Sequence, residues 1–359
     1  MICAYCFAFL VWLGEATGGL AVPDDLAADM FPPGYAAGAR IFSNSWGGSY
    51  WYDGYAIQVD NFLYDHPDAV IFFAAGNDGG LGKDTVLSPG LSKNAIAVAA
   101  LLVDRAGVER ASFSARGPAP DGRFKPDIAG PGSSITSARA RGEDSENYAE
   151  TCELESMGGT SMATPVCAGN SALIKQYFDD SQFWRRYCDR LHALCATTVP
   201  WTLSGALLKG AVLHSGSSDA PDFSFGFGRL TLTNLLPLKS YPQSNFSLYI
   251  DQFELQSFQA VSYKATVLGQ RSRMMVTLSW YDPPNVVFSS KALLHDLDLV
   301  VKTPSGRIVF GNNDYRLDQH FRDELNNVEK VIIPIDYLEI GDYTVTVQSR
   351  LLTESPAQR

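Results

Sequence analysis

Short apolar runs that alternate with helical segments are the feature that most constrains the fold of this chain. Three runs are apolar and β-rich along their whole length, as strands buried on both faces are: residues 39–44, 69–75 and 94–101. Helical patterns lie between and after them, at residues 53–64, 160–178 and 203–214. This alternation predicts an α/β fold built on a parallel sheet with helices on both faces.

One further helical pattern, over residues 24–38, contains Pro32-Pro33. Proline lacks the backbone N–H and its ring clashes with the preceding turn of a helix. We therefore expect this helix to break or kink at the two prolines.

The pattern changes after about residue 238. Short alternating strands are predicted at residues 260–267, 274–280, 297–302, 328–335 and 342–347, separated by turn signals such as Asp282-Pro283-Pro284. Strands of this length and spacing predict an all-β sandwich. The boundary is expected between 237 and 244, which gives domains over 1–238 and 239–359.

Composition and charge exclude some functions. The 359 residues carry a formal charge of -11, with a sequence pI of about 4.9, so the surface repels phosphate backbones and nucleic-acid binding is not expected. The apolar segment 1–13 is too short for a stable membrane span. It also lacks the basic residue of a signal peptide, and a buried strand is the favoured interpretation, with a signal sequence left open. The sequon at Asn245 is a weak indication of a secretory route.

The six cysteines are too few for a disulfide scaffold in a chain of this length. Cys188 and Cys195 lie close together and either form a bridge or remain free thiols. Cys167 lies in an apolar helical run, where it is expected to act as a small core residue.

The segment 159–165 (GTSMATP) opens the predicted helix at 160 and places Ser161 at its start. The first N–H groups of a helix lack partners and lie at the positive end of its dipole, so they favour an oxyanion formed beside Ser161. The alternative interpretation of Ser161 is a simple N-cap.

Segment 159–165 resembles the nucleophile motif of the subtilisin-like (subtilase, S8) serine proteases. The resemblance covers about residues 14–232, and three further segments share it in order: 43–48 (SNSWGG), 74–77 (AAGN) and 125–132 (KPDIAGPG). In that family the first of the three forms a wall of the substrate cleft, the second holds the oxyanion-hole asparagine, and the third is a turn before the serine region.

The resemblance implies that Ser161 is the nucleophile and that Asn77 donates to the oxyanion. It also implies that extended polypeptide substrates bind along two segments that flank the pocket for the side chain before the cut: Ser45, Trp46 and Gly47, and Ala74, Ala75 and Gly76. Asn77 can alternatively belong to a plain turn, and Trp46 can be core packing.

The catalytic base is missing from the pattern. Neither the histidine motif nor the aspartate motif of the family occurs here, and His66, the one histidine before Asn77, lies where a helix is expected to end, most simply in solvent. The simplest explanation is that both partners lie upstream of Met1, so the chain as written is expected to be nearly inactive.

The resemblance therefore implies a serine endopeptidase, secreted by family habit, that requires no cofactor for its chemistry. The second hypothesis is a pseudoprotease that binds peptides without cleaving them, and the third is adhesion or sugar binding by the β domain. The segments 294–299 (LHDLDL) and 326–329 (NNVE) resemble the jelly-roll domain that follows the catalytic domain in some bacterial-type subtilases. Strand alternation places Asp296 and Asp298 on one face. Two carboxylates on one face can help to bind a structural Ca²⁺ ion, although a solvated face or a turn cap is the favoured interpretation.

Overall fold

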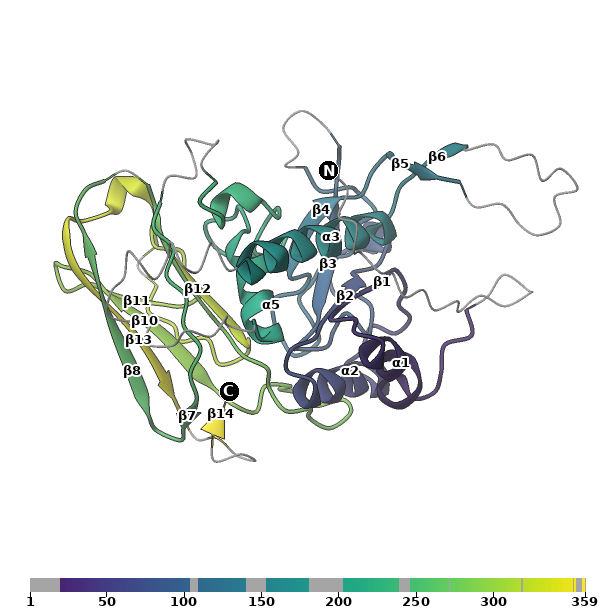
Figure 1. Cartoon of the computed structure of the whole chain (residues 1–359), viewed down its shortest axis with the longest axis horizontal. Helices are drawn as coiled ribbons and strands as arrows, with labels where there is room; N and C mark the ends of the chain where they lie inside the picture. The colour runs from purple at the N-terminus through teal and green to yellow at the C-terminus, as the bar shows by residue number, and fades with distance from the viewer. Residues whose placement is uncertain are drawn as a thin grey trace, which may run out of the picture.

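The computed structural model describes residues 20–103, 109–139, 153–180, 203–238, 246–270, 272–317, 319–350, 352 and 357–358 (Figure 1). Several predictions fall outside these residues: the strand at 1–13, the state of Cys188 and Cys195, the sequon asparagine and most of the boundary segment 237–244. They stay predictions.

A parallel sheet of four strands forms the centre of the first part of the chain. Its strands lie in the order β1 (Ile41–Asn44), β2 (Val70–Ala74), β3 (Ile96–Leu101) and β4 (Ile128–Pro131). Phe72 lies opposite Ile96, and Val98 lies opposite Ile128. The three predicted strands are confirmed to within two residues at each end.

Strand β4 corrects the expectation of a turn over 125–132. Gly130 and Pro131 conceal the strand, because both residues are unusual within a sheet. The structure explains the glycine: a Cβ at position 130 would lie 2.6 Å from Cys167 Sγ, on the helix that crosses the sheet. Gly130 therefore allows close packing of strand and helix.

Alternating residues of β2 face opposite helical layers. Val70 and Phe72 pack into one buried cluster with α3 (Thr160–Asp179) and α5 (Gly205–His214). Ile71 and Phe73 pack into another cluster with α1 (Phe31–Ala36) and α2 (Gly54–Asp65). All five residues of β2 are buried, which explains why its sequence is apolar without alternation. Helices on both faces of a parallel sheet are thus confirmed (Figure 1).

The predicted break at Pro32-Pro33 is confirmed as a helix start. A π-helical turn over Leu26–Met30 precedes α1, and the two prolines occupy the first turn of α1. The missing N–H of a proline costs nothing there, because the first N–H groups of a helix have no intrahelical partner.

The C-terminal part consists mainly of antiparallel strands. One sheet has the order β11 (Ile308–Phe310), β10 (Leu297–Lys302), β13 (Gly341–Ser349) and β8 (Ala260–Val267), and β12 (Val328–Ile333) pairs with β9 (Met274–Ser279). Shorter pairs join β7 (Leu255–Gln256) to β14 (Ala357–Gln358), and β5 (Ile135–Ala138) to β6 (Leu154–Met157) in the first part of the chain. The five predicted strands are confirmed, whereas the all-β sandwich and its jelly-roll connectivity stay predictions.

One apolar cluster lies between the β10 sheet and the β9–β12 pair. Leu299 and Tyr343 come from the first, Val331 from the second, and the buried indole of Trp280 joins them. We call residues 246–358 the β unit and residues 20–238 the α/β unit.

Buried polar groups join the two units. Lys93 and Asp282, both fully buried, form an ion pair, and Lys93 Nζ also donates to the Pro283 and Ala292 carbonyls. Lys330 Nζ, from β12, donates to three carbonyls at the end of α5 and beyond: Leu213, His214 and Gly216. Buried groups of this kind cost free energy unless they are paired, so the units stabilise each other only when docked.

Candidate active site

Ser161 lies in the first turn of α3, at the carboxyl edge of the parallel sheet. Gly159 is the N-cap of α3 and Thr160 its first residue. Because β1 and β2 are parallel and adjacent, the segments that follow them, beginning at Ser45 and Ala75, leave the sheet at the same edge. Ligand sites of open α/β sheets form at this edge. Ser161 itself is half-buried.

Asn77 caps the start of α3 through Thr160. Its Oδ1 accepts hydrogen bonds of 2.9 Å from both Thr160 N and Thr160 Oγ1. Only the oxygen of the amide can accept from an N–H group, so Nδ2 must point the other way. No described residue accepts a hydrogen bond from Nδ2, and a Cβ built on Gly159 would lie 3.6 Å from it. The Asn77 amide is therefore a free donor beside the residues that precede Ser161.

Ser45 is bonded to Ser161 in both directions. Ser45 Oγ donates to the Ser161 carbonyl at 2.7 Å, and Ser161 Oγ donates to the Ser45 carbonyl at 3.2 Å. Pro165 lies inside α3, four residues after Ser161, and has no N–H to give to that carbonyl. The Ser45 hydroxyl replaces the missing helical bond and fixes the cleft segment beside the nucleophile.

Gly76 links the second flanking segment to the same helix start. Its N–H donates to Thr160 Oγ1 at 3.2 Å, and its φ of +113° is a conformation that glycine adopts without strain. Ala74 and Ala75, which precede it, are buried. The sequence-predicted Ser45, Gly76, Asn77 and Ser161 are thus brought together around Thr160.

Trp46 occupies a different environment. Its indole lies edge-on to the rings of Phe73, at 5.5 Å between centroids, and Tyr55, at 6.5 Å. It therefore packs on the cluster between β2 and α2, as the core-packing alternative predicted, and only its backbone belongs to the cleft segment.

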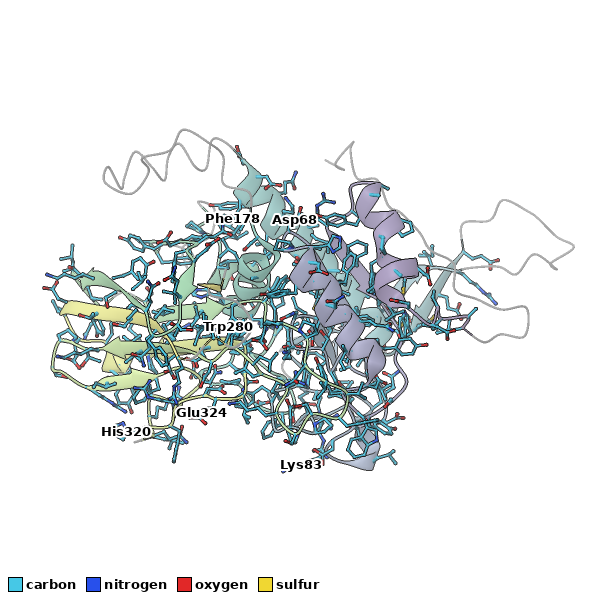
Figure 2. All side chains as sticks on the ribbon, turned by 90° about the horizontal axis from the view of Figure 1, so that it is seen from below. Asp68, Lys83, Phe178, Trp280, His320 and Glu324 are labelled. Carbon is cyan, nitrogen blue, oxygen red and sulfur yellow. The ribbon has the colours of Figure 1, made fainter. Side chains whose placement is uncertain are left out.

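The described histidines lie away from Ser161. His66 directly follows the last residue of α2, as predicted. The prediction that it is solvated is wrong, because its ring is half-buried and stacks on Phe62, with 4.1 Å between the ring centroids. His214 bonds Thr277 at the joint between the units. His295 and His320 belong to the β unit, where Figure 2 labels His320. No described histidine donates to or accepts from Ser161 Oγ.

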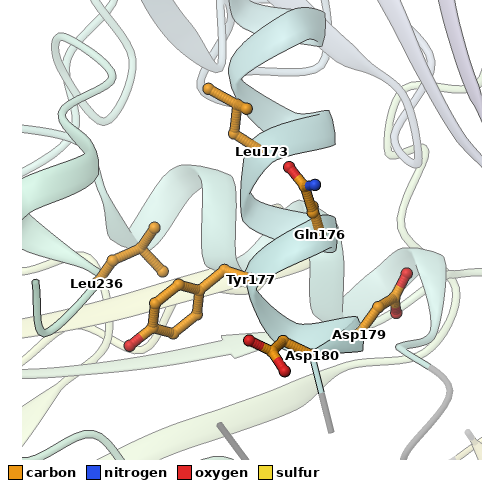
Figure 3. A pocket seen from close by; sticks show the side chains of 6 residues that line it. All are labelled: Leu173, Gln176, Tyr177, Asp179, Asp180 and Leu236. Atoms are coloured by element: carbon orange, nitrogen blue, oxygen red, sulfur yellow. The ribbon is translucent and has the colours of Figure 1, made fainter. Parts of the chain in front are cut away.

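A hollow of about 520 Å³ lies at the other end of α3 (Figure 3). Its lining includes the apolar side chain of Leu236, the ring of Tyr177, and the carboxylates of Asp179 and Asp180. A helix rises about 1.5 Å per residue, so the sixteen residues from Ser161 to Tyr177 separate the hollow from the nucleophile by about 24 Å. The hollow therefore does not belong to the site around Ser161.

Cys167 is a core residue, as predicted. It is buried under the sheet, and burial raises the pKa of its thiol to about 12. The reactive thiolate form is therefore disfavoured.

The two carboxylates considered for calcium are paired with cations. Asp298 is buried, and its Oδ2 accepts from Arg322 at 2.5 Å, Gln348 at 3.0 Å and Arg350 at 3.4 Å. Asp296 Oδ2 lies 3.6 Å from Arg350 Nε. The expectation of a solvated face is therefore wrong for Asp298. Within the described ranges, no three His, Cys, Asp or Glu side chains are grouped so as to hold a metal ion.

Three features of the site were missed by sequence reasoning: the bridging role of Thr160, the carbonyl freed by Pro165, and the position of Leu87. A Cβ built on Gly47 or on Gly76 would lie 2.8 Å from the Leu87 side chain, so Leu87 lies beside both flanking segments. Thr160 and Pro165 stand inside the motif that marks Ser161, so a closer look at helical hydrogen bonding could have found the freed carbonyl. No sequence signal marks Leu87.

The chain spans only part of the length of the curated relatives that it matches. The serine protease/ABC transporter B family protein tagB of Dictyostelium discoideum is 27% identical over 439 residues, which cover 87% of this chain and 23% of tagB. Serine protease AprX of Bacillus subtilis is 41% identical over 119 residues, 31% of this chain and 27% of AprX. The chain thus spans about a quarter of either relative.

Among solved structures, the psychrophilic subtilisin-like protease Apa1 of Pseudoalteromonas sp. AS-11 is similar with a TM-score of 0.44 and 14% identity, over 66% of this chain and 78% of Apa1. None of the described helices combines the length and hydropathy that crossing a bilayer requires. The family model described as the subtilase family matches residues 20–228, more than half of the chain. The chain therefore belongs to the subtilase family of serine proteases.

Proposed function

We propose that this chain carries the nucleophile and oxyanion hole of a serine endopeptidase that cleaves peptide bonds through an acyl-enzyme. The observation that carries the proposal is the orientation of Asn77: its Oδ1 is held by Thr160, and its Nδ2 is left free beside the start of α3. A neutral donor fixed in advance stabilises a developing oxyanion without reorganisation.

In this proposal Ser161 Oγ attacks the scissile carbonyl carbon and gives its proton to a base. The oxygen of the tetrahedral adduct accepts hydrogen bonds from Asn77 Nδ2 and from the Ser161 N–H, which has no intrahelical partner. The C–N bond then breaks, the amine leaves with the proton from the base, and water hydrolyses the Ser161 ester.

The base is the part that the described residues do not supply. Ser161 Oγ donates to the Ser45 carbonyl, which cannot take the proton from it. The proposed activity therefore requires a histidine, held by a carboxylate, from residues outside the described ranges.

The proposed substrate is an extended polypeptide. The segment Ser45–Gly47 leaves β1 at the sheet edge, and a peptide added beside it as a further strand would present a carbonyl near Ser161. We propose that the chemistry requires no cofactor. We also propose that the protein is secreted, because members of this family commonly are.

Active-site labelling of the complete gene product tests the proposal. A fluorophosphonate probe reacts only with an activated serine, so labelling of the wild type that disappears in Ser161→Ala supports it. The control is Ser171→Ala, a buried serine on the same helix, which should label like the wild type. A folded wild type that is not labelled contradicts the proposal.

The second candidate function is peptide binding without cleavage. It is favoured by the bond from Ser161 Oγ to the Ser45 carbonyl, which leaves the hydroxyl engaged and without a base among the described residues. Saturable binding of an unmodified peptide, unchanged in Ser161→Ala and without any product, would select this function over the first.

A further inference from the structure

An exposed apolar surface is formed jointly by the two units. The loop between β9 and β10 contributes three consecutive exposed apolar side chains, Val286, Val287 and Phe288, and the α/β unit contributes Trp51. The rings of Phe288 and Trp51 lie edge-on, with 6.5 Å between their centroids, and they are 68% and 58% exposed. Neighbouring exposed apolar side chains, unlike single scattered ones, mark binding surfaces. We call these four residues the apolar surface.

The loop that carries most of the apolar surface is fixed to the α/β unit at both ends. Lys93 Nζ donates to the Pro283 carbonyl at 2.5 Å and to the Ala292 carbonyl at 2.8 Å. Ala292 also packs with Tyr52 and with Ala56 of α2, so the loop leaves the β unit and reaches α2 (Figure 1). The apolar side chains are therefore held in place before anything binds to them.

Phe288 has a backbone conformation that phenylalanine rarely adopts. Its φ of +59° lies in the left-handed region, which is unfavourable for a bulky side chain. The Phe288 N–H donates to the Tyr52 carbonyl at 3.2 Å, on the residue directly after Trp51. A contact with the other unit thus keeps the strained residue beside Trp51. Strain of this kind persists where the surrounding structure determines it, and it gathers at functional sites.

The apolar surface continues the proposed substrate cleft. Ser45 is the residue of the cleft segment that is bonded to Ser161, and Gly47 ends that segment. Trp51 follows Gly47 by four residues, which span at most about 14 Å. A peptide that extends along the segment from Ser45 would therefore reach Trp51 about six residues from the cut. The substrate itself is the ligand that passes this surface.

We infer that the apolar surface binds an apolar stretch of the polypeptide substrate, about five to eight residues before the cut, so that the β unit takes part in substrate selection. The inference rests on the proposed function, because it names a substrate feature recognised beside the same cleft. Aromatic side chains that are already fixed give a large contact area with little further loss of side-chain freedom.

The test compares two peptides that differ only at six to eight residues before the cut, with the complete gene product as enzyme. One peptide has Leu-Leu-Phe at these positions, and the other has Ser-Gly-Ser. We expect kcat/KM to be at least about tenfold higher for the apolar peptide. The difference should lie in KM with kcat nearly equal, because the contact is the same in the ground state and the transition state.

Phe288→Asn should bring the ratio of the two kcat/KM values close to one. Asparagine removes the ring but tolerates the left-handed conformation, so the loop keeps its backbone. Trp51→Ser should lower the ratio in the same way from the other unit. Phe258→Asn is the matched control and should keep the wild-type ratio, since Phe258 lies elsewhere on the β unit with a φ of +61° and is 75% exposed.

Equal kcat/KM values for the two peptides in the wild type would overturn the inference. An unchanged ratio in folded Phe288→Asn and Trp51→Ser would do the same, and so would an equal loss in Phe258→Asn. Sedimentation of the wild type tests a second copy of the chain as the occupant. A dimer that becomes a monomer in Phe288→Asn would make the surface an interface between copies and exclude substrate binding there.

If neither peptide is cleaved and no probe labels Ser161, the proposed function fails instead. The same two peptides are then compared by equilibrium binding. Tighter binding of the apolar peptide that is lost in Phe288→Asn and kept in Phe258→Asn supports the inference, whereas equal Kd values overturn it.

Discussion

Ser45 Oγ donates a 2.7 Å hydrogen bond to the main-chain carbonyl of Ser161, and Ser161 Oγ donates one of 3.2 Å to the main-chain carbonyl of Ser45. The first bond exists because Pro165 has no N–H for the carbonyl one helical turn before it. A proline inside a helix is usually destabilising. Here it leaves an acceptor that couples the cleft segment to the nucleophile.

Ser45→Ala should therefore lower both stability and reactivity. It removes the donor to the Ser161 carbonyl, which we expect to cost about 1 kcal/mol in the free energy of unfolding. The loosened cleft segment should also slow fluorophosphonate labelling of Ser161. Urea unfolding and labelling rates of the complete protein measure the two effects.

Ser45→Thr keeps the hydroxyl and should behave like the wild type. Ser43→Ala is the matched control, since Ser43 is an exposed residue of β1 two positions earlier. If Ser45→Ala and Ser43→Ala are equally stable and equally reactive, the bond to Ser161 has no such role.

Asn77 should have two separable roles, one for each end of its amide. Asn77→Asp keeps an acceptor for Thr160 at the positive end of α3 and should fold with nearly unchanged stability. It loses the Nδ2 donor and places a negative charge beside the oxyanion, so the labelling rate should fall by at least about 10²- to 10³-fold.

Asn77→Ala loses both the acceptor and the donor. Its labelling rate should fall as much as that of Asn77→Asp. It should also lose about 1 kcal/mol in the free energy of unfolding, because the cap of α3 is gone. Equal labelling by Asn77→Asp and the wild type would remove Asn77 from the oxyanion hole, whatever the stability of the variants.

Local pattern was sufficient to predict most of the secondary structure. Strands β8 and β10 have the predicted bounds, because alternating or continuous apolar runs depend on neighbours along the chain. Strand β4 was missed because Gly130 is selected by its contact with α3, a tertiary effect that hides the strand pattern. The apolar pattern of a segment indicates which of its own residues are buried, but it does not indicate which helix packs across that segment.

The site was predicted in its residues but not in its contacts. Ser161 and Asn77 follow from motifs, whereas the bonds that position them join residues 116 and 83 apart in sequence. The surroundings of Asp298 were wrongly expected to be solvent, because Arg322 and Arg350 reach it from segments 24 and 52 residues away. Leu87 belongs to no motif, and only the fold places it beside Gly47 and Gly76.

The ion pair between Lys93 and Asp282 should make the α/β unit and the β unit unfold together. Both side chains are fully buried, so Lys93→Met leaves the Asp282 carboxylate without its cation. We expect a loss of about 3–5 kcal/mol in the free energy of unfolding, with a single transition retained. Denaturant unfolding followed by circular dichroism and tryptophan fluorescence measures both.

Lys264–Asp342 is the matched control, since both partners of this pair are more than half exposed. Lys264→Met should change stability by less than about 1 kcal/mol. Two separate transitions in the wild type, or equal effects of Lys93→Met and Lys264→Met, would contradict the coupling of the two units.

Calcium should leave the thermal midpoint of the protein unchanged if it acts only through Asp296 and Asp298. The Asp298 carboxylate already accepts from Arg322, Gln348 and Arg350, and a cation would have to displace both guanidinium groups. Melting with millimolar calcium and with EDTA measures the effect. A higher midpoint in calcium that disappears in Asp298→Asn would show that the ion does bind there.

Asp296 should make stability fall as the pH rises from about 4 to 6. Burial, with the neighbouring Asp298 carboxylate, raises the pKa of Asp296 to about 6, whereas an unfolded aspartate has a pKa near 3.9. Between these values the folded protein holds a proton that the unfolded chain releases. The contribution of the protonated Asp296 side chain to the free energy of unfolding is therefore complete below about pH 4 and lost above about pH 6. Asp296→Asn should raise the free energy of unfolding at pH 7, measured by urea unfolding, and flatten this part of the profile.

Asp342 should give a pH dependence of stability opposite in sign to that of Asp296. Hydrogen bonds from Lys264 and Thr266 lower the pKa of its carboxyl, so its contribution is present at neutral pH and is lost as the pH falls through the lowered value. Asp342→Asn should therefore lower stability at pH 7, the reverse of Asp296→Asn, with a small effect because salt and water screen this exposed pair. If both variants change stability at pH 7 in the same direction, burial of Asp296 is not the cause of its pH dependence, because a general loss of negative charge would then explain both.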